Sequence, residues 1–66
     1  MKAGEYNKIV KLVMKKLEKG QNTEQIAEAL EEDIETITKI IELLGEAKER
    51  KEGLAYIVNQ LAEQEN

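Results

Sequence analysis

The chain has 66 residues, a net charge of −4 and no cysteine, histidine, proline, tryptophan or phenylalanine. A chain of this length forms one small domain, so residues 1–66 are expected to be a single helical unit. Without cysteine or histidine it lacks disulfides, thiolate zinc sites, redox pairs and the commonest general base. No apolar run approaches the ~18 residues of a membrane span, and no apolar signal segment follows the N-terminus. We therefore expect a soluble, cytoplasmic domain.

The charge is distributed unevenly along the chain. Residues 2–19 carry a net charge of +4, residues 23–46 carry −7, and residues 47–66 carry −1. A basic first segment followed by an acidic middle makes the domain an electric dipole. Solvated helix faces explain this pattern most simply, and a field that orients a charged partner is the alternative.

The composition and the apolar spacing predict an all-α fold with four helices, at about 5–19, 23–31, 34–44 and 47–63. In the first segment Gly20 stands where a left-handed C-terminal cap belongs. The apolar residues of this segment recur every three or four positions and form one stripe: Tyr6, Ile9, Val10, Val13, Met14 and Leu17.

Capping signals mark the next two segments. Asn22 and Gln25 have the spacing of a capping box, and Asp33 looks like a second cap. Gly45 is expected to end the third segment. The predicted buried faces are Ile26, Ala27 and Leu30 in the second segment, and Ile34, Ile37, Ile40, Ile41 and Leu44 in the third.

Gly53 interrupts the last segment. It either breaks the segment in two or costs about 1 kcal/mol inside one helix. We expect residues 46–52 to be a frayed lead-in and residues 54–63 to be the firm part. Residues 1–4 and 64–66 are expected to be disordered.

The second and third segments have the spacing of a helix-turn-helix unit, with a three-residue turn between them. Ile37 is expected to pack back on Ile26 and Leu30. A DNA-binding role would need exposed basic or amide side chains on the second helix of the unit. Glu35 and Glu42 stand there instead, which disfavours contact with phosphates. A small DNA-binding protein is therefore the alternative rather than the main hypothesis.

No catalytic constellation emerges from the sequence, so we expect neither enzyme activity nor a cofactor. The Glu-x-Lys matches at residues 46–48 and 49–51 resemble half of a nuclease site that needs a strand, whereas this stretch is predicted to be helical or frayed. Asp33 with Glu35 or Glu42 would bind a divalent cation only weakly, because no calcium loop is present.

Three stretches together resemble the C-terminal tail of the Rpn proteins, the recombination-promoting nucleases. These stretches are residues 9–20, residues 21–30 with their Glu-Gln-Ile-Ala sequence, and residues 35–40. The resemblance covers residues 9–44 and not the nuclease domain, so no catalytic residue is carried over. In that family a small product of an internal start binds and restrains the full-length nuclease, and a chain starting at Met1 is similar to such a product.

The resemblance implies an antitoxin-like interaction module whose partner is a nuclease of the same family. An acidic cluster is the expected contact with a basic nucleic-acid groove of that partner: Glu28, Glu31, Glu32, Asp33 and Glu35. Pairing with a copy of this domain inside the larger protein is the other mode. Acidic residues also suit a helix N-terminus without any partner.

Self-association is a separate expectation. A core of this size rarely supplies more than about 3–5 kcal/mol without staples. We expect a homodimer, the commonest assembly, with a stand-alone oligomerisation domain as a further alternative. Its interface is expected to be the apolar stripe of the last segment: Leu54, Ile57, Val58 and Leu61.

Overall fold

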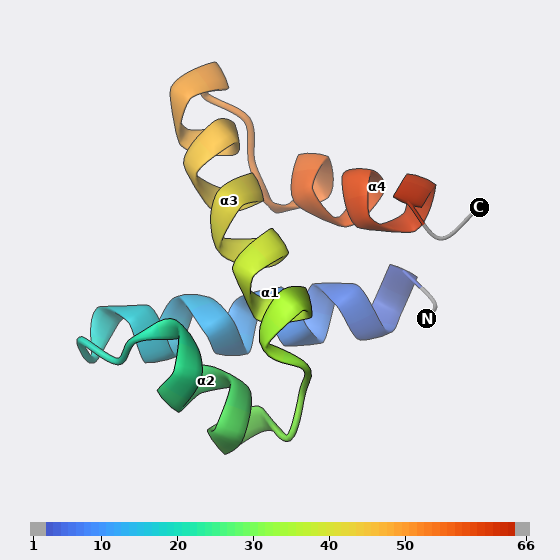
Figure 1. Cartoon of the computed structure of the whole chain (residues 1–66). Coiled ribbons are helices and arrows are strands. Elements are labelled where there is room, and N and C mark those ends of the chain that lie inside the picture. The colour runs from blue at the N-terminus through green and yellow to red at the C-terminus, as the bar shows by residue number, and fades with distance from the viewer. Residues whose placement is uncertain (1–2, 65–66) are drawn as a thin grey trace.

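Four helices make up the part of the chain that the computed structural model describes, residues 3–64 (Figure 1). They are α1 (Ala3–Glu18), α2 (Thr23–Leu30), α3 (Ile34–Arg50) and α4 (Leu54–Gln64). The predicted all-α fold with four helices is confirmed. Helices α1 and α4 extend into the end segments expected to be disordered, and residues 1–2 and 65–66 of those segments lie outside the described residues.

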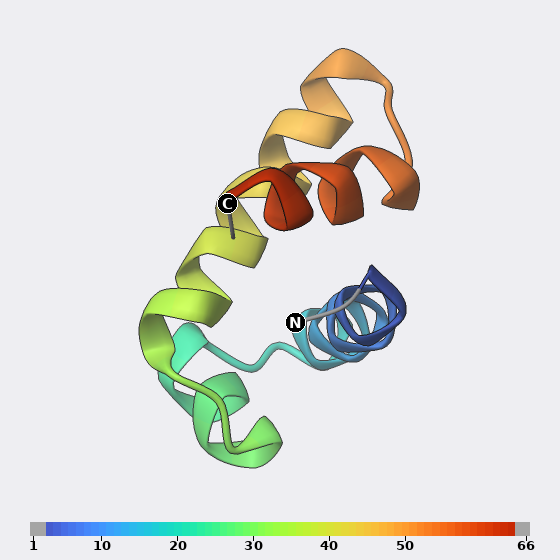
Figure 2. The same ribbon diagram turned by 90° about the vertical axis from the view of Figure 1, so that its right-hand side faces the viewer.

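Helices α1 and α4 pack against each other and cross, because Figure 2 shows α1 nearly end-on while α4 runs across the view, and α3 crosses both (Figures 1 and 2). Helix α2 packs against α1 and against α3, which it joins at the N-terminal end of α3. It does not contact α4. The radius of gyration is 11.0 Å, against about 10.8 Å expected for a packed chain of this length. The open-looking space between the ribbons is therefore largely filled by side chains.

One apolar cluster holds all four helices together. Val10, Val13, Ile26, Ile37 and Ile40 are fully buried. Around them lie the other buried members of the cluster: Tyr6, Ala27, Leu43, Ala47, Ile57, Val58 and Leu61. No polar or charged side chain among residues 4–63, whose burial the structure describes, is buried. The helices are thus held by non-directional burial of apolar surface.

The predicted core faces need three changes. Met14 and Ile34 were assigned to buried stripes, yet they are 42% and 46% exposed. Leu43, absent from the predicted face, is buried instead. Neighbouring helix positions point about 100° apart, so Val13 and Met14 cannot both face the same core.

The predicted boundary at Gly45 is wrong. Helix α3 continues through Gly45 to Arg50, so residues 46–50 are the last turns of α3 rather than a frayed lead-in. Ala47 is buried in the core, which ties these turns to the rest of the domain. That burial offsets the cost of about 1 kcal/mol for a glycine inside a helix. The predicted start of the last helix at 47 is likewise corrected to Leu54, the beginning of the part expected to be firm.

Three helices end in the same left-handed turn. A residue with positive φ follows each of these helices: Glu31 (55°) and Lys51 (58°) come directly after α2 and α3, and Gly20 (81°) is two residues beyond α1. After α2, the backbone amide of Glu32 donates to the carbonyl of Ala27 at 2.9 Å, which is the hydrogen bond of a Schellman cap. Only Gly20 has the residue type suited to this conformation. Glu31 and Lys51 therefore carry local strain.

The two predicted N-caps differ. Asn22 forms a complete capping box: its Oδ1 accepts from the Gln25 amide at 2.8 Å, and its own amide donates to Gln25 Oε1 at 2.9 Å. This prediction is confirmed. Asp33 occupies the N-cap position of α3, but its side chain accepts no capping hydrogen bond. Asp33 is therefore the N-cap residue of α3, as predicted, but it caps the helix without a side-chain hydrogen bond, and its charge suits the helix dipole.

Asn22→Ala should lower the free energy of unfolding by about 1 kcal/mol, because it removes the Oδ1 that accepts from the Gln25 amide at the start of α2. Asp33→Ala, the matched control, should cost less because no such bond exists there. Urea denaturation followed by circular dichroism measures both. Equal losses at the two positions would contradict the difference between the caps.

Glu31→Gly should raise the free energy of unfolding by up to about 1 kcal/mol, because glycine adopts the left-handed conformation without a Cβ clash. Glu28→Gly, an exposed position inside α2, is the control and should lower it by roughly 0.5–1 kcal/mol. Thermal denaturation of the two variants tests the sign of each effect. A loss of stability in Glu31→Gly would show that the strain is absent.

Candidate functional site

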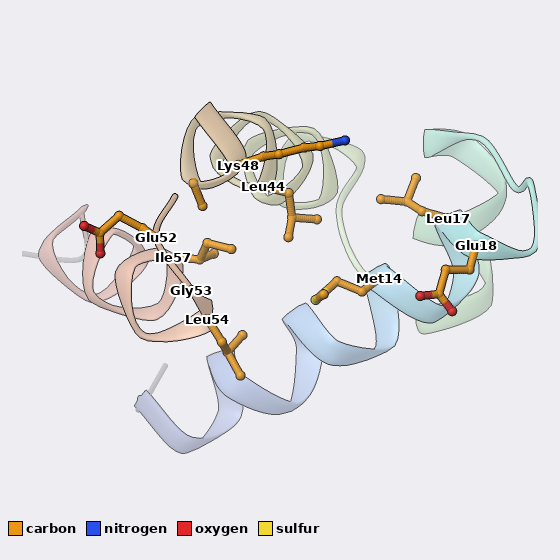
Figure 3. Close-up of a pocket in the computed structure, with 10 residues that line it drawn as sticks. Met14, Leu17, Glu18, Leu44, Lys48, Glu52, Gly53, Leu54 and Ile57 are labelled. Atoms are coloured by element: carbon orange, nitrogen blue, oxygen red, sulfur yellow. The ribbon is translucent and has the colours of Figure 1, made fainter. Parts of the chain in front are cut away.

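An open apolar pocket lies where α1, α3 and the start of α4 meet (Figure 3). Its volume is about 450 Å³. In Figure 3 the side chains of Met14, Leu44 and Ile57, one from each helix, converge on the same space. The pocket is lined by Met14, Leu17, Glu18, Leu44, Ala47, Lys48, Glu52, Gly53, Leu54 and Ile57.

Helical spacing places these side chains together. Met14 and Leu17 are three residues apart on α1, and Leu54 and Ile57 have the same separation on α4. Residues three or four apart share one face of a helix. The turn at residues 51–53 then brings the first turn of α4 over the gap between α1 and α3. The pocket therefore depends on three helices and on one short connection.

The exposed part of the lining is mainly apolar. Met14 is 42% exposed and Ile57 only 2%, so one stands at the mouth and the other at the floor. Leu17, Leu44 and Leu54 are half-buried. Water in this pocket contacts hydrocarbon on several sides, which favours any apolar group that replaces it. Methionine is flexible and polarisable, so Met14 can adapt its shape to such a group.

Charged side chains stand only at the rim. Glu18, Lys48 and Glu52 are exposed (Figure 3). An apolar floor inside a charged rim binds an apolar group and leaves its polar surroundings in water.

The acidic cluster predicted from the sequence lies on another part of the molecule. Glu28 is on α2, Glu35 is on α3, and residues 31–33 form the turn between the two helices. Four of these five acidic residues are exposed, and the fifth, Glu32, is half-buried. Within residues 3–64 no group of three or more acidic side chains is placed to hold a metal ion. The cluster is thus an exposed acidic corner made by the α2–α3 turn.

The helix-turn-helix-like pair forms with the predicted three-residue turn. Ile26 and Ile37 are both fully buried, as this unit requires. Its outward face on α3 holds a shallow depression of about 310 Å³. There the Thr38 hydroxyl donates to the Ile34 carbonyl at 2.8 Å. The depression is lined by Ile34, Glu35, Thr38, Lys39 and Glu42.

The stripe assigned to a dimer interface is used inside the single chain. Ile57, Val58 and Leu61 belong to the core, and Leu54 lines the pocket. The structure brings these four residues together, but not on a free surface. The Glu-x-Lys stretches lie at the helical end of α3 and in the turn after it, so neither is on a strand.

Sequence reasoning missed the pocket because it placed both Val13 and Met14 in one buried stripe of the first segment. The adjacent pair Val13-Met14 was the available signal. A helix that buries Val13 turns Met14 toward a second surface, which needs its own partner side chains. Those partners come from α3 and α4, whose positions the periodicity of the first segment does not contain.

No protein-family model matches the chain, and no curated protein and no solved structure shows a significant match to it. Among residues 3–64 no helix is both long enough and apolar enough to cross a bilayer.

Met14→Gln should change the free energy of unfolding by less than about 1 kcal/mol, because the side chain is largely in water. Ile57→Ala should cost roughly 2–5 kcal/mol, because it opens a cavity under the same pocket. Chemical denaturation of both variants measures the difference. Comparable losses would place Met14 in the structural core rather than at the mouth of a site.

Proposed function

We propose that this chain is a small, non-catalytic protein-binding module whose α1–α3–α4 pocket receives an apolar side chain of its partner. The observation that carries the proposal is the exposed Met14 at the mouth of an apolar pocket. An exposed apolar recess rimmed by charge is a common feature of protein-interaction surfaces.

The chemistry of the pocket favours a protein partner over a small molecule. Small-molecule sites combine apolar walls with a few polar groups that fix the ligand's orientation. Here the charged groups are those of exposed rim side chains, Glu18, Lys48 and Glu52. An amphipathic helix of a partner offers an apolar anchor together with polar neighbours for such a rim. The absence of histidine and cysteine from the chain supports a role without catalysis.

The partner we propose is a nuclease of the Rpn family, which this chain restrains as an antitoxin restrains its toxin. The resemblance of residues 9–44 to the tail of that family supports this choice. The exposed acidic corner at the α2–α3 turn supports it too, because carboxylates compete with phosphates for a basic groove. In this proposal the pocket provides the anchor and the acidic corner blocks the nucleic-acid groove.

A small DNA-binding protein is the second candidate, favoured by the helix-turn-helix-like arrangement of α2 and α3. The outward face of α3 argues against DNA binding, because Glu35 and Glu42 lie there beside Lys39. Carboxylates at this place repel phosphates.

Met14→Gln should weaken binding to an immobilised Rpn nuclease roughly tenfold, because an apolar contact at the pocket mouth is replaced by a polar one. Ile34→Gln is the matched control, since Ile34 is equally exposed but lies on the face of α3 outside the pocket. It should change the affinity less than about twofold. Surface plasmon resonance with folded variants measures both.

The same experiment separates the alternatives. If only Ile34→Gln lowered the affinity for the nuclease, the contact would lie on the α2–α3 unit and not at the pocket. No binding to the nuclease, together with retention of random DNA in a low-salt gel shift, would favour the DNA-binding candidate.

Charge reversal of the acidic corner, as Glu28→Lys with Glu31→Lys, should abolish inhibition of the nuclease on a labelled DNA substrate while leaving the Met14 contact in place. Reversal of Glu24 and Glu63, exposed acids outside the corner, is the control. Inhibition that survives reversal of the corner would show that the acidic cluster is not the inhibitory surface.

A further inference from the structure

The connection between α3 and α4 is short, exposed and strained. It consists of residues 51–53, all of which are exposed. Lys51 has φ 58°, a conformation that lysine adopts only at a cost. The turn is closed by the Glu52 amide, which donates to the Ala47 carbonyl at 2.8 Å. This turn reverses the chain and lays α4 over α1.

Side-chain packing rather than this connection holds α4 in place. Ile57, Val58 and Leu61 are buried in the core, and α4 packs against both α1 and α3. The Arg50 guanidinium lies over the Tyr56 ring, 5.6 Å from its centroid, and so links the two sides of the turn. An identical α4 from another molecule would pack against the same face of α1 and α3 with the same contacts.

We propose that the face of α1 and α3 that holds α4 also accepts α4 of a second copy, giving a dimer with exchanged last helices. In that dimer residues 51–53 become helical and join α3 and α4 into one helix. The stretch Lys48-Glu49-Arg50-Lys51-Glu52 consists of good helix formers, and opening the turn releases the strain at Lys51. Short, strained hinges favour such exchange.

The proposal accounts for the dual character of the last apolar stripe. The sequence predicts Leu54, Ile57, Val58 and Leu61 as a dimer interface, whereas in the single chain Ile57, Val58 and Leu61 are core and Leu54 packs against it. In the exchanged dimer the buried residues of α4 form the dimer interface and the core at once, because they fill the core of the other copy. This inference does not depend on the proposed function.

Two hinge variants should shift the dimer in opposite directions. Gly53→Ala places no Cβ within 4 Å of a neighbouring atom and is not at a positive φ, so the closed turn accommodates it. It should tighten the dimer roughly 30-fold, because both hinges of the dimer gain helix propensity. Lys51→Gly should weaken it by at least roughly 30-fold, because glycine relaxes the closed turn and disfavours the helix.

Glu31→Gly is the matched control, because it relieves the same strain at a turn that the exchange does not open. It should leave the dimer dissociation constant unchanged. Sedimentation equilibrium after refolding at high protein concentration measures all four proteins. Equal dissociation constants for Lys51→Gly and Gly53→Ala, or a wild type and Gly53→Ala that both stay monomeric, would overturn the proposal.

Spin labels distinguish helix exchange from a dimer of closed copies. The chain has no cysteine, so Lys8→Cys on α1 and Asn59→Cys on α4 give single labelling sites at exposed positions. In a dimer of two singly labelled chains, the α1-to-α4 distance between copies should equal the distance within a doubly labelled monomer. A different distance between copies would show that α4 stays on its own chain.

Discussion

Burial of a single apolar cluster is the interaction on which the whole domain depends. Val10 and Val13 of α1 share this cluster with Ile37 and Ile40 of α3. Within residues 4–63 no buried polar or charged side chain adds a directional bond to it. Packing of the buried faces of α2 and α4 against the central pair therefore determines where these two helices lie.

The pocket is the place where this packing is incomplete. Helices α1 and α4 pack against each other but cross, since Figure 2 shows α1 nearly end-on and α4 running across the view, and α3 crosses both (Figures 1 and 2). Where three helices meet at unequal angles, side chains of ordinary size leave space between them. Met14 and Leu44 point into that space without filling it (Figure 3). The same geometry that closes the core on one side thus leaves an apolar surface open on the other.

Charge and apolar surface are separated on this molecule. The acidic corner is made by the α2–α3 turn, whereas the pocket lies at the α3–α4 turn near the other end of α3. Helix α3 connects them as a rigid element of 17 residues. A partner that contacts both regions has to extend along α3, which makes a large macromolecule a better match than a compact ligand.

Much of the fold was predictable because local signals were strong. The 3.6-residue periodicity gave four helices, and the Asn22-Gln25 pair gave a capping box that the structure contains in full. The helix end predicted at Gly45 was wrong, because a helix can continue through a glycine when the residues after it bury apolar surface. Here Ala47 is buried, and α3 continues. The acidic corner was predictable as a run of residues, whereas the pocket was not, because its lining comes from three separate helices.

The sequence by itself thus determined the four helices, the Asn22 capping box and the segregation of charge, since these follow from neighbours a few residues apart. The tertiary structure alone decided which apolar residues stay in water. Met14 is exposed and Ile57 is buried, although both belong to apolar stripes of similar spacing. Periodicity gives the direction of a side chain about its own helix axis, but the angle at which the next helix crosses determines whether anything covers it.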